Sequence, residues 1–161
     1  MTELNYKCLL QACDIIIVSR NKNRLCKLLN NIFGNTAFPT FNIFLFLFDD
    51  LCAITNSMGV QNRKLFLYDS DVTTVLALRC SNLTYIQRNI IIENALQQAA
   101  DKHSFVFKRV KRKALSCTRF ITQCFLDVGI ILFPDKSPET VTVDDFLNCS
   151  LLEKIIINEC Q

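Results

Sequence analysis

Apolar and polar residues follow two kinds of spacing along the chain, and the alternation between them predicts a mixed α/β fold. Residues 6–18 and 41–48 are largely apolar runs rich in strand formers, which indicates buried strands. Between them, residues 22–33 carry apolar side chains at helical spacing and stop at Gly34, a residue typical of a helix C-terminus. The first part of the chain is therefore predicted as strand, helix, strand.

The middle of the chain repeats these patterns. Short strands are expected at residues 64–68 and 72–80, and the longest helical pattern covers residues 83–100. A strand at residues 104–110 and a helix at residues 117–129 follow. This order predicts an α/β (α+β) domain of ferredoxin-like or RNA-recognition-like type, in which a split βαβ sheet carries its helices on one face.

Two segments fall outside this unit. Residues 49–63 are rich in turn formers and are predicted to be an inserted loop or short helix. Residues 134–161 are acidic, and a plausible helix cap at Thr142 precedes apolar residues up to Ile155. We therefore expect a domain over residues 1–133 with an insertion, followed by an extension that forms an extra C-terminal helix.

The predicted helix over residues 83–100 is apolar on two sides, whereas a surface helix normally shows one apolar stripe. The aromatic run at residues 38–48 adds further apolar surface. Because large exposed apolar patches usually mark interfaces, we expect a partner protein to cover the excess. The residues expected to bind this partner are Ile92, Leu96, Phe44 and Phe46.

The composition narrows the possible functions. Half of the 161 residues are hydrophobic and 20% are charged, so the chain can bury a sizeable core and differs from disordered proteins. The single histidine, His103, lies in no catalytic motif, and the three isolated glycines form neither a P-loop nor a dinucleotide-binding turn. No Cys-x-x-Cys motif supports a zinc site. The sequence therefore predicts a non-catalytic protein without a cofactor, metal or small-molecule substrate, and a thiol enzyme is a remote alternative.

Nine cysteines would suit a disulfide framework in a secreted protein, but the N-terminal residues lack the features of a signal peptide. We therefore expect a reducing, intracellular environment in which the cysteines act as small buried hydrophobic residues. Disulfides are the less favoured alternative. No apolar stretch reaches the length of a membrane span, so no membrane contact is expected.

The strongest local feature is basic. Residues 108–113 hold five cations within six residues, directly after an aromatic predicted strand. Such a cluster neutralises phosphates and gives sequence-tolerant, salt-sensitive affinity for nucleic acid. The alternative is a solvated basic turn or a nuclear import signal. The residues expected to bind RNA are Lys108, Arg109, Lys111, Arg112, Lys113, Arg119 and Arg79.

Several motifs of the chain resemble those of a family of small protein subunits of ribonuclease P and ribonuclease MRP, called Pop-five and Rpp-fourteen. Residues 28–34 are similar to the family's helix that closes on Phe-Gly. The resemblance continues with residues 65–68 and then residues 74–80. The latter segment looks like the family's strand that ends in Arg-Cys before its long helix. Residues 105–110 and 116–121 are similar to the strand and the Thr-Cys-containing helix of Pop-five.

This resemblance implies a non-catalytic subunit of a ribonucleoprotein whose RNA cleaves the 5′ leader of precursor tRNA in a metal-dependent reaction. The subunit would order the ribonuclease P or MRP RNA, dock a TIM-barrel-like protein subunit, and work in tRNA or rRNA processing in the nucleus, specifically the nucleolus. The competing hypothesis is a protein-interaction scaffold, or a regulatory or viral accessory protein, with no specific role in RNA binding.

Overall fold

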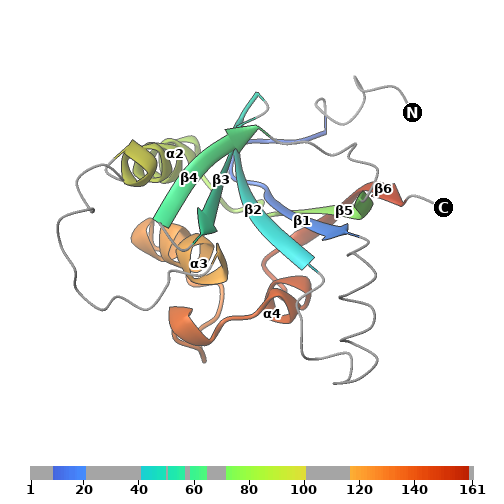
Figure 1. Ribbon diagram of the computed structural model, residues 1–161. Helices are drawn as coiled ribbons and strands as arrows, with labels where there is room; N and C mark the ends of the chain where they lie inside the picture. The colour runs from blue at the N-terminus through green and yellow to red at the C-terminus, as the bar shows by residue number, and fades with distance from the viewer. Residues whose placement is uncertain are drawn as a thin grey trace.

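A computed structural model describes residues 9–20, 41–49, 51–56, 59–64, 72–100 and 117–159. The described chain forms one antiparallel sheet with helices packed against it, so the α+β class is confirmed (Figure 1). The strands are β1 (Ile15–Arg20), β2 (Phe41–Phe48), β3 (Leu51–Asn56), β4 (Gly59–Lys64), β5 (Val72–Arg79) and β6 (Glu153–Glu159). The helices are α2 (Tyr85–Ala100), α3 (Cys117–Asp127), the 3-10 helix η3 (Pro138–Thr140) and the short α4 (Val143–Leu147).

The six strands lie in the order β4-β3-β2-β1-β5-β6, and every pairing is antiparallel. The central strand β1 pairs directly with β2 on one side and β5 on the other. In the expected split βαβ pattern another strand would separate β1 from β2. The described strands therefore leave the ferredoxin-like arrangement unconfirmed.

Strand β2 shows why the sheet is buried on both faces. Ile43, Leu45 and Leu47 belong to the main core, which α2 and α3 cover. Phe44 and Phe46 point to the opposite face, where a smaller apolar cluster lies. Because successive strand residues point to opposite faces, a continuous apolar run is the pattern that a doubly buried strand requires. The prediction of a doubly buried strand over residues 41–48 is therefore confirmed.

Other elements that follow local signals are also where we predicted them. The strand predicted at residues 72–80 and the helices predicted at residues 83–100 and 117–129 are β5, α2 and α3. The expected cap at Thr142 begins α4 with a complete capping box, in which Thr142 and Asp145 bond each other's backbone N–H groups. The helix predicted at residues 22–33, the strand at 104–110 and most of the strand at 64–68 lie outside the described residues.

The prediction for residues 49–63 was wrong. Of these residues, 51–56 and 59–63 form neither a loop nor a helix but the antiparallel strand β3 and most of β4, which extend the sheet beyond β2. The polar sequence of β4 has no strong apolar alternation, and Val60 is its one fully buried side chain. Its strand conformation depends on the ladder that it forms with β3, a tertiary feature that local composition does not encode.

The predicted C-terminal helix is also shorter than expected. Helix α4 ends at Leu147, and residues 153–159 form β6, which pairs with β5 and places Ile155 opposite Ala77. The β-branched residues of this segment suit a pleated ladder better than a helix. Residues of the expected extension therefore contribute a strand to the sheet. No helix within the described ranges has both the length and the apolar character needed to cross a membrane.

Candidate nucleic-acid interface

The cation at the end of β5, Arg79, is held by a buried carboxylate. Its Nε atom donates to Asp14 Oδ1 at 2.9 Å, and its Nη2 atom donates to Asp14 Oδ2 at 2.7 Å. Nη2 also donates to the backbone carbonyl of Leu9 at 2.6 Å. The Asp14 side chain has no exposed surface and that of Arg79 is 16% exposed. The hydrogen bonds to Asp14 raise the pKa of the Arg79 guanidinium above its ordinary value.

This ion pair fixes the segment that leads into β1. Asp14 also accepts the backbone N–H of Gln11 at 2.8 Å, and Arg88 of α2 donates to the carbonyl of Ala12 at 2.5 Å. The backbone of Cys13 takes a positive φ of 70°, which costs energy for a residue with a side chain. Arg79 and Arg88, both more than 60 positions away in the sequence, therefore hold this strained turn in place.

The geometry bears directly on Arg79 as an RNA-binding residue. Its guanidinium already makes a bidentate pair, the strongest arrangement available to an arginine. A phosphate that displaced Asp14 would leave a buried carboxylate without its counter-ion, which is strongly unfavourable. The contacts of Arg79 are those of a residue that stabilises the fold, and its part in RNA binding stays a prediction.

Arg119, in the first turn of α3, forms a looser pair. Its Nη2 atom lies 3.2 Å from Oε1 of Glu139, and the two side chains are 33% and 49% exposed. An exposed ion pair contributes about 0 to 1 kcal/mol, so a phosphate could compete for this guanidinium. Arg119 lies on the helical side of the sheet and Arg79 on the other face, so the fold does not bring these two cations together. The other five predicted cations, Lys108, Arg109, Lys111, Arg112 and Lys113, lie outside the described residues.

The four residues expected to bind a partner are less exposed than a partner surface requires. Phe46 is buried and Phe44 is half-buried in the cluster on the face away from the helices. Ile92 and Leu96 are half-buried against the main core. Their role in partner binding stays a prediction, and any partner would meet only part of each side chain.

The exposed apolar surface of α2 lies instead on the other predicted stripe. Ile86 is 69% exposed, Ile90 is 39% exposed, and the neighbouring Tyr85 is 78% exposed. Leu83, from the same stripe, is buried. The excess of apolar surface that the sequence indicated is therefore present on α2, but at its N-terminal half.

No disulfide joins the six cysteines of the described segments, and four of them are buried: Cys13, Cys52, Cys80 and Cys124. Burial raises the pKa of Cys13 and of Cys124 to about 12, so both stay protonated and unreactive at neutral pH. Cys117 is half-exposed, and its sulfur accepts the backbone N–H of Thr55 at 3.2 Å and its hydroxyl at 2.9 Å. Within the described part of the chain, no three His, Cys, Asp or Glu side chains form a group that could hold a metal ion.

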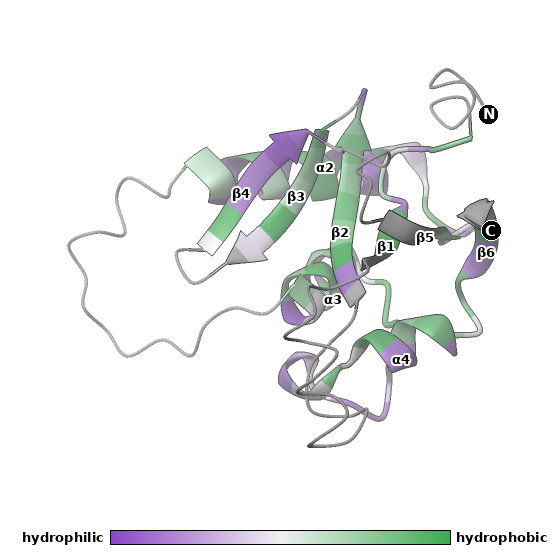
Figure 2. Cartoon of the chain, turned by 45° about the vertical axis from the view of Figure 1, so that its right-hand side comes forward, coloured by the Kyte–Doolittle hydropathy of each residue, from purple (hydrophilic) through white to green (hydrophobic). Residues whose placement is uncertain are grey.

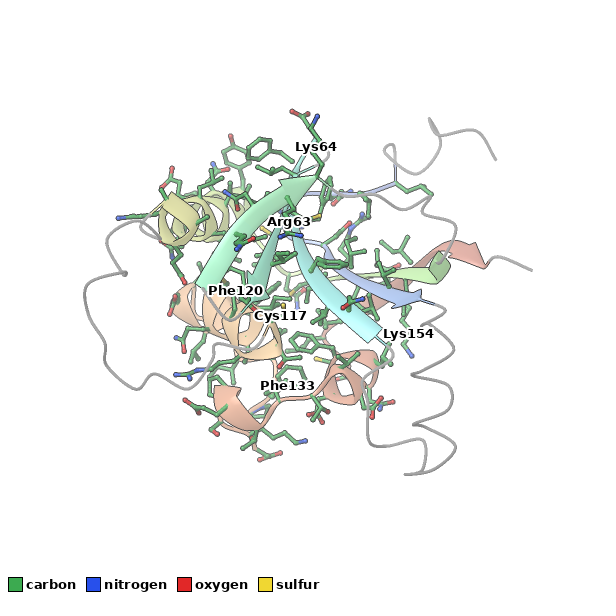
Figure 3. The ribbon with its side chains drawn as sticks, viewed as in Figure 1. Arg63, Lys64, Cys117, Phe120, Phe133 and Lys154 are labelled. Atoms are coloured by element: carbon green, nitrogen blue, oxygen red, sulfur yellow. The ribbon has the colours of Figure 1, made fainter. Side chains whose placement is uncertain are left out.

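Sequence reasoning missed the partner of Arg79. Asp14 precedes four apolar β-branched residues, and an acid next to a buried strand indicates that a cation or backbone donors must compensate it. It also missed the exposed cations Arg63, Lys64 and Lys154, which Figure 3 labels on β4 and β6. Arg63 lies in the segment that we had predicted to be an insertion, and Lys64 directly follows it.

Comparison of the chain with protein-family models and with curated proteins finds no match. The function therefore has to be argued from the residues themselves.

Proposed function

We propose that this protein is a non-catalytic RNA-binding subunit of a ribonuclease P or MRP-like ribonucleoprotein, which supports RNA-catalysed 5′ processing of precursor tRNA or rRNA. The observation that carries the proposal is the density of cations at residues 108–113, five within six positions, which no other part of the chain approaches. The resemblance of short motifs to Pop-five and Rpp-fourteen adds the identity of the particle.

The rest of the proposal follows from that resemblance. A TIM-barrel-like subunit of the same particle is the proposed protein partner, and the nucleolus is the proposed location. The proposed domain is ferredoxin-like, although the direct β1–β2 pairing departs from that pattern. The α+β sheet is compatible with an RNA-binding module, but such folds serve many functions and do not identify one.

Charge reversal of Lys111, Arg112 and Lys113 to Glu tests the proposal. If these residues contact phosphates, affinity for structured RNA should fall for all sequences alike, and the slope of log affinity against log salt should flatten by about 2 to 3 units. Filter binding or fluorescence anisotropy at several salt concentrations measures both quantities. Circular dichroism checks that the variant is folded.

A matched control reverses three exposed cations elsewhere, Arg63, Lys64 and Lys154, and changes the net charge by the same amount. If only net charge matters, both triple variants should lose affinity equally, and the proposed RNA-binding residues are then wrong. Wild-type protein that shows no affinity for structured RNA at low salt removes the proposal itself.

A second candidate, a protein-interaction module without an RNA role, is favoured by the exposed apolar residues Tyr85, Ile86 and Ile90 on α2. If charge reversal at residues 111–113 abolishes RNA binding and the matched control variant keeps it, that result counts against this second candidate.

A further inference from the structure

Within the described part of the chain, β4 is an outer strand of the sheet. Among the described strands, β4 is the last in the order and pairs only with β3. The β3–β4 register has no irregularity, and neither strand contains proline. Natural proteins protect an exposed edge with proline, a bulge, a covering segment or charged side chains. Of these devices the described edge carries only the charges of Arg63 and Lys64, which favour a strand of opposite charge.

The contacts of Thr55 identify which groups on β4 point outward. Its N–H and its carbonyl both bond the sulfur of Cys117, so both point away from β4. Thr55 and its partner Val60 are then a pair without mutual hydrogen bonds. Because such pairs alternate along an antiparallel ladder, Val60, Asn62 and Lys64 direct their backbone N–H and C=O groups to the open edge.

A second observation places an unsatisfied group at the same edge. Among the described residues, the buried side-chain oxygen Oδ1 of Asn62 is the one buried polar side-chain atom without a hydrogen-bond partner. Buried polar atoms are nearly always paired in folded proteins, and each exception calls for an explanation. Asn62 is also one of the three residues whose backbone faces outward, so this unpaired oxygen belongs to a residue of the edge.

Helix α2 supplies an apolar floor beneath this edge. It packs against β4 and β3, whereas α3 packs against β2 and β3, and Figure 1 shows α2 reaching past the outer side of β4. The side chain of Gln87 bonds the carbonyl of Val128 after α3, which marks the side of α2 that faces α3. At about 100° per residue, Ile92 and Leu96 lie about 140° and 180° around the helix from Gln87. These half-buried residues are thus on the side of α2 opposite the one that faces α3, and both pack against the main core.

The charge at the edge determines which partner fits. Arg63 and Lys64 are exposed, and Figure 2 shows β4 as more hydrophilic than β2. Arg63 lies opposite Cys52, on the face away from the helices, and its guanidinium donates a 3.2 Å hydrogen bond to the neutral side chain of Gln61. An added strand would point alternate side chains toward α2 and toward the face of Arg63. Apolar residues on one side and acids on the other complement these surroundings.

We propose that the edge of β4 binds an extended acidic segment of a partner protein, which adds a strand to the sheet and turns its apolar side chains toward the helical face. Main-chain hydrogen bonds supply affinity in this mode of recognition, and alternate side chains supply specificity. The inference does not depend on RNA binding at residues 108–113.

The probe is a fluorescein-labelled nine-residue peptide that alternates valine with glutamate, titrated against the full chain and compared with a valine–lysine peptide. The acidic peptide should bind saturably and the basic one at least tenfold more weakly. Two further acidic peptides carry N-methyl groups on alternate amides, in opposite registers. One register should lose at least tenfold in affinity and the other should not, because only alternate amides face β4. Equal effects of the two registers, or no binding of the acidic peptide at millimolar concentration, would overturn the proposal.

The matching protein variants are Asn62→Pro, which removes an outward N–H without removing a ladder bond, and Asn62→Ala, which keeps that N–H. The proline variant should bind the peptide at least tenfold more weakly than the alanine variant. If the proline variant unfolds by circular dichroism, the two N-methylated peptides decide the question with wild-type protein. Displacement of the peptide by oligouridylate, or concentration-dependent self-association that blocks the peptide, would assign the edge to RNA or to a second copy and refute the proposal.

Discussion

Replacing Arg79 with alanine should destabilise the protein more than any other change to an exposed or half-exposed cation. The substitution removes both hydrogen bonds from Arg79 to the Asp14 carboxylate and leaves that buried group with the N–H of Gln11 as its remaining donor among the described residues. Breaking a buried ion pair from one side costs about 3 to 5 kcal/mol, because the other charge is stranded. For a chain of this size, that corresponds to a fall in Tm of about 6 to 20 °C.

Urea denaturation followed by circular dichroism measures the loss as a lower midpoint with an unchanged slope. Arg63→Ala is the matched control, since this exposed arginine donates to the neutral side chain of Gln61, and its loss should change the free energy of unfolding by less than about 0.5 kcal/mol. Adding Asp14→Leu to Arg79→Leu should recover part of the lost stability, because the stranded charge is then gone.

The opposite pattern would refute this reasoning. If Arg79→Ala leaves the urea midpoint at the wild-type value but lowers affinity for structured RNA, Arg79 is a phosphate ligand and the ion pair with Asp14 contributes little. A loss of both stability and RNA affinity leaves the fold argument intact, since an altered fold also alters the RNA-binding surface.

Two further predictions address the core. Burial raises the pKa of Cys13 and Cys124 from 9.0 to about 12, so these thiols lose their protons at lower pH in the unfolded chain than in the folded one. The free energy of unfolding should therefore be constant with respect to these groups below about pH 9 and should fall between about pH 9 and 12. The loss is up to about 4 kcal/mol for each thiol. Urea midpoints at pH 8 and pH 11 measure the loss, and an unchanged pH dependence in Cys124→Ala would contradict the assignment. Phe146→Ala should cost about 3 to 5 kcal/mol, because this ring is fully buried in the main core and meets Phe133 edge to face at 5.0 Å. The exposed Leu151 provides the control for thermal unfolding, and equal Tm values for Phe146→Ala and Leu151→Ala would show that this segment does not stabilise the core.

The sequence by itself determined the elements whose signals are local. The apolar run over residues 41–48 predicted a doubly buried strand, and helical spacing predicted α2 and α3. The cap at Thr142 was readable because its bonds join residues only three positions apart. In each case residues that are close together in the sequence determine the feature, either a buried face or a capped N–H group.

Only the tertiary structure decided the elements that depend on distant partners. Residues 153–159 form a strand rather than a helix because β5, more than 70 positions earlier in the chain, offers a ladder. The side chain of Arg79 was visible as a cation at a strand end, but its partner Asp14 lies 65 residues away in the sequence. Strand pairing and buried ion pairs join residues far apart along the chain, so no local pattern of spacing or charge contains them.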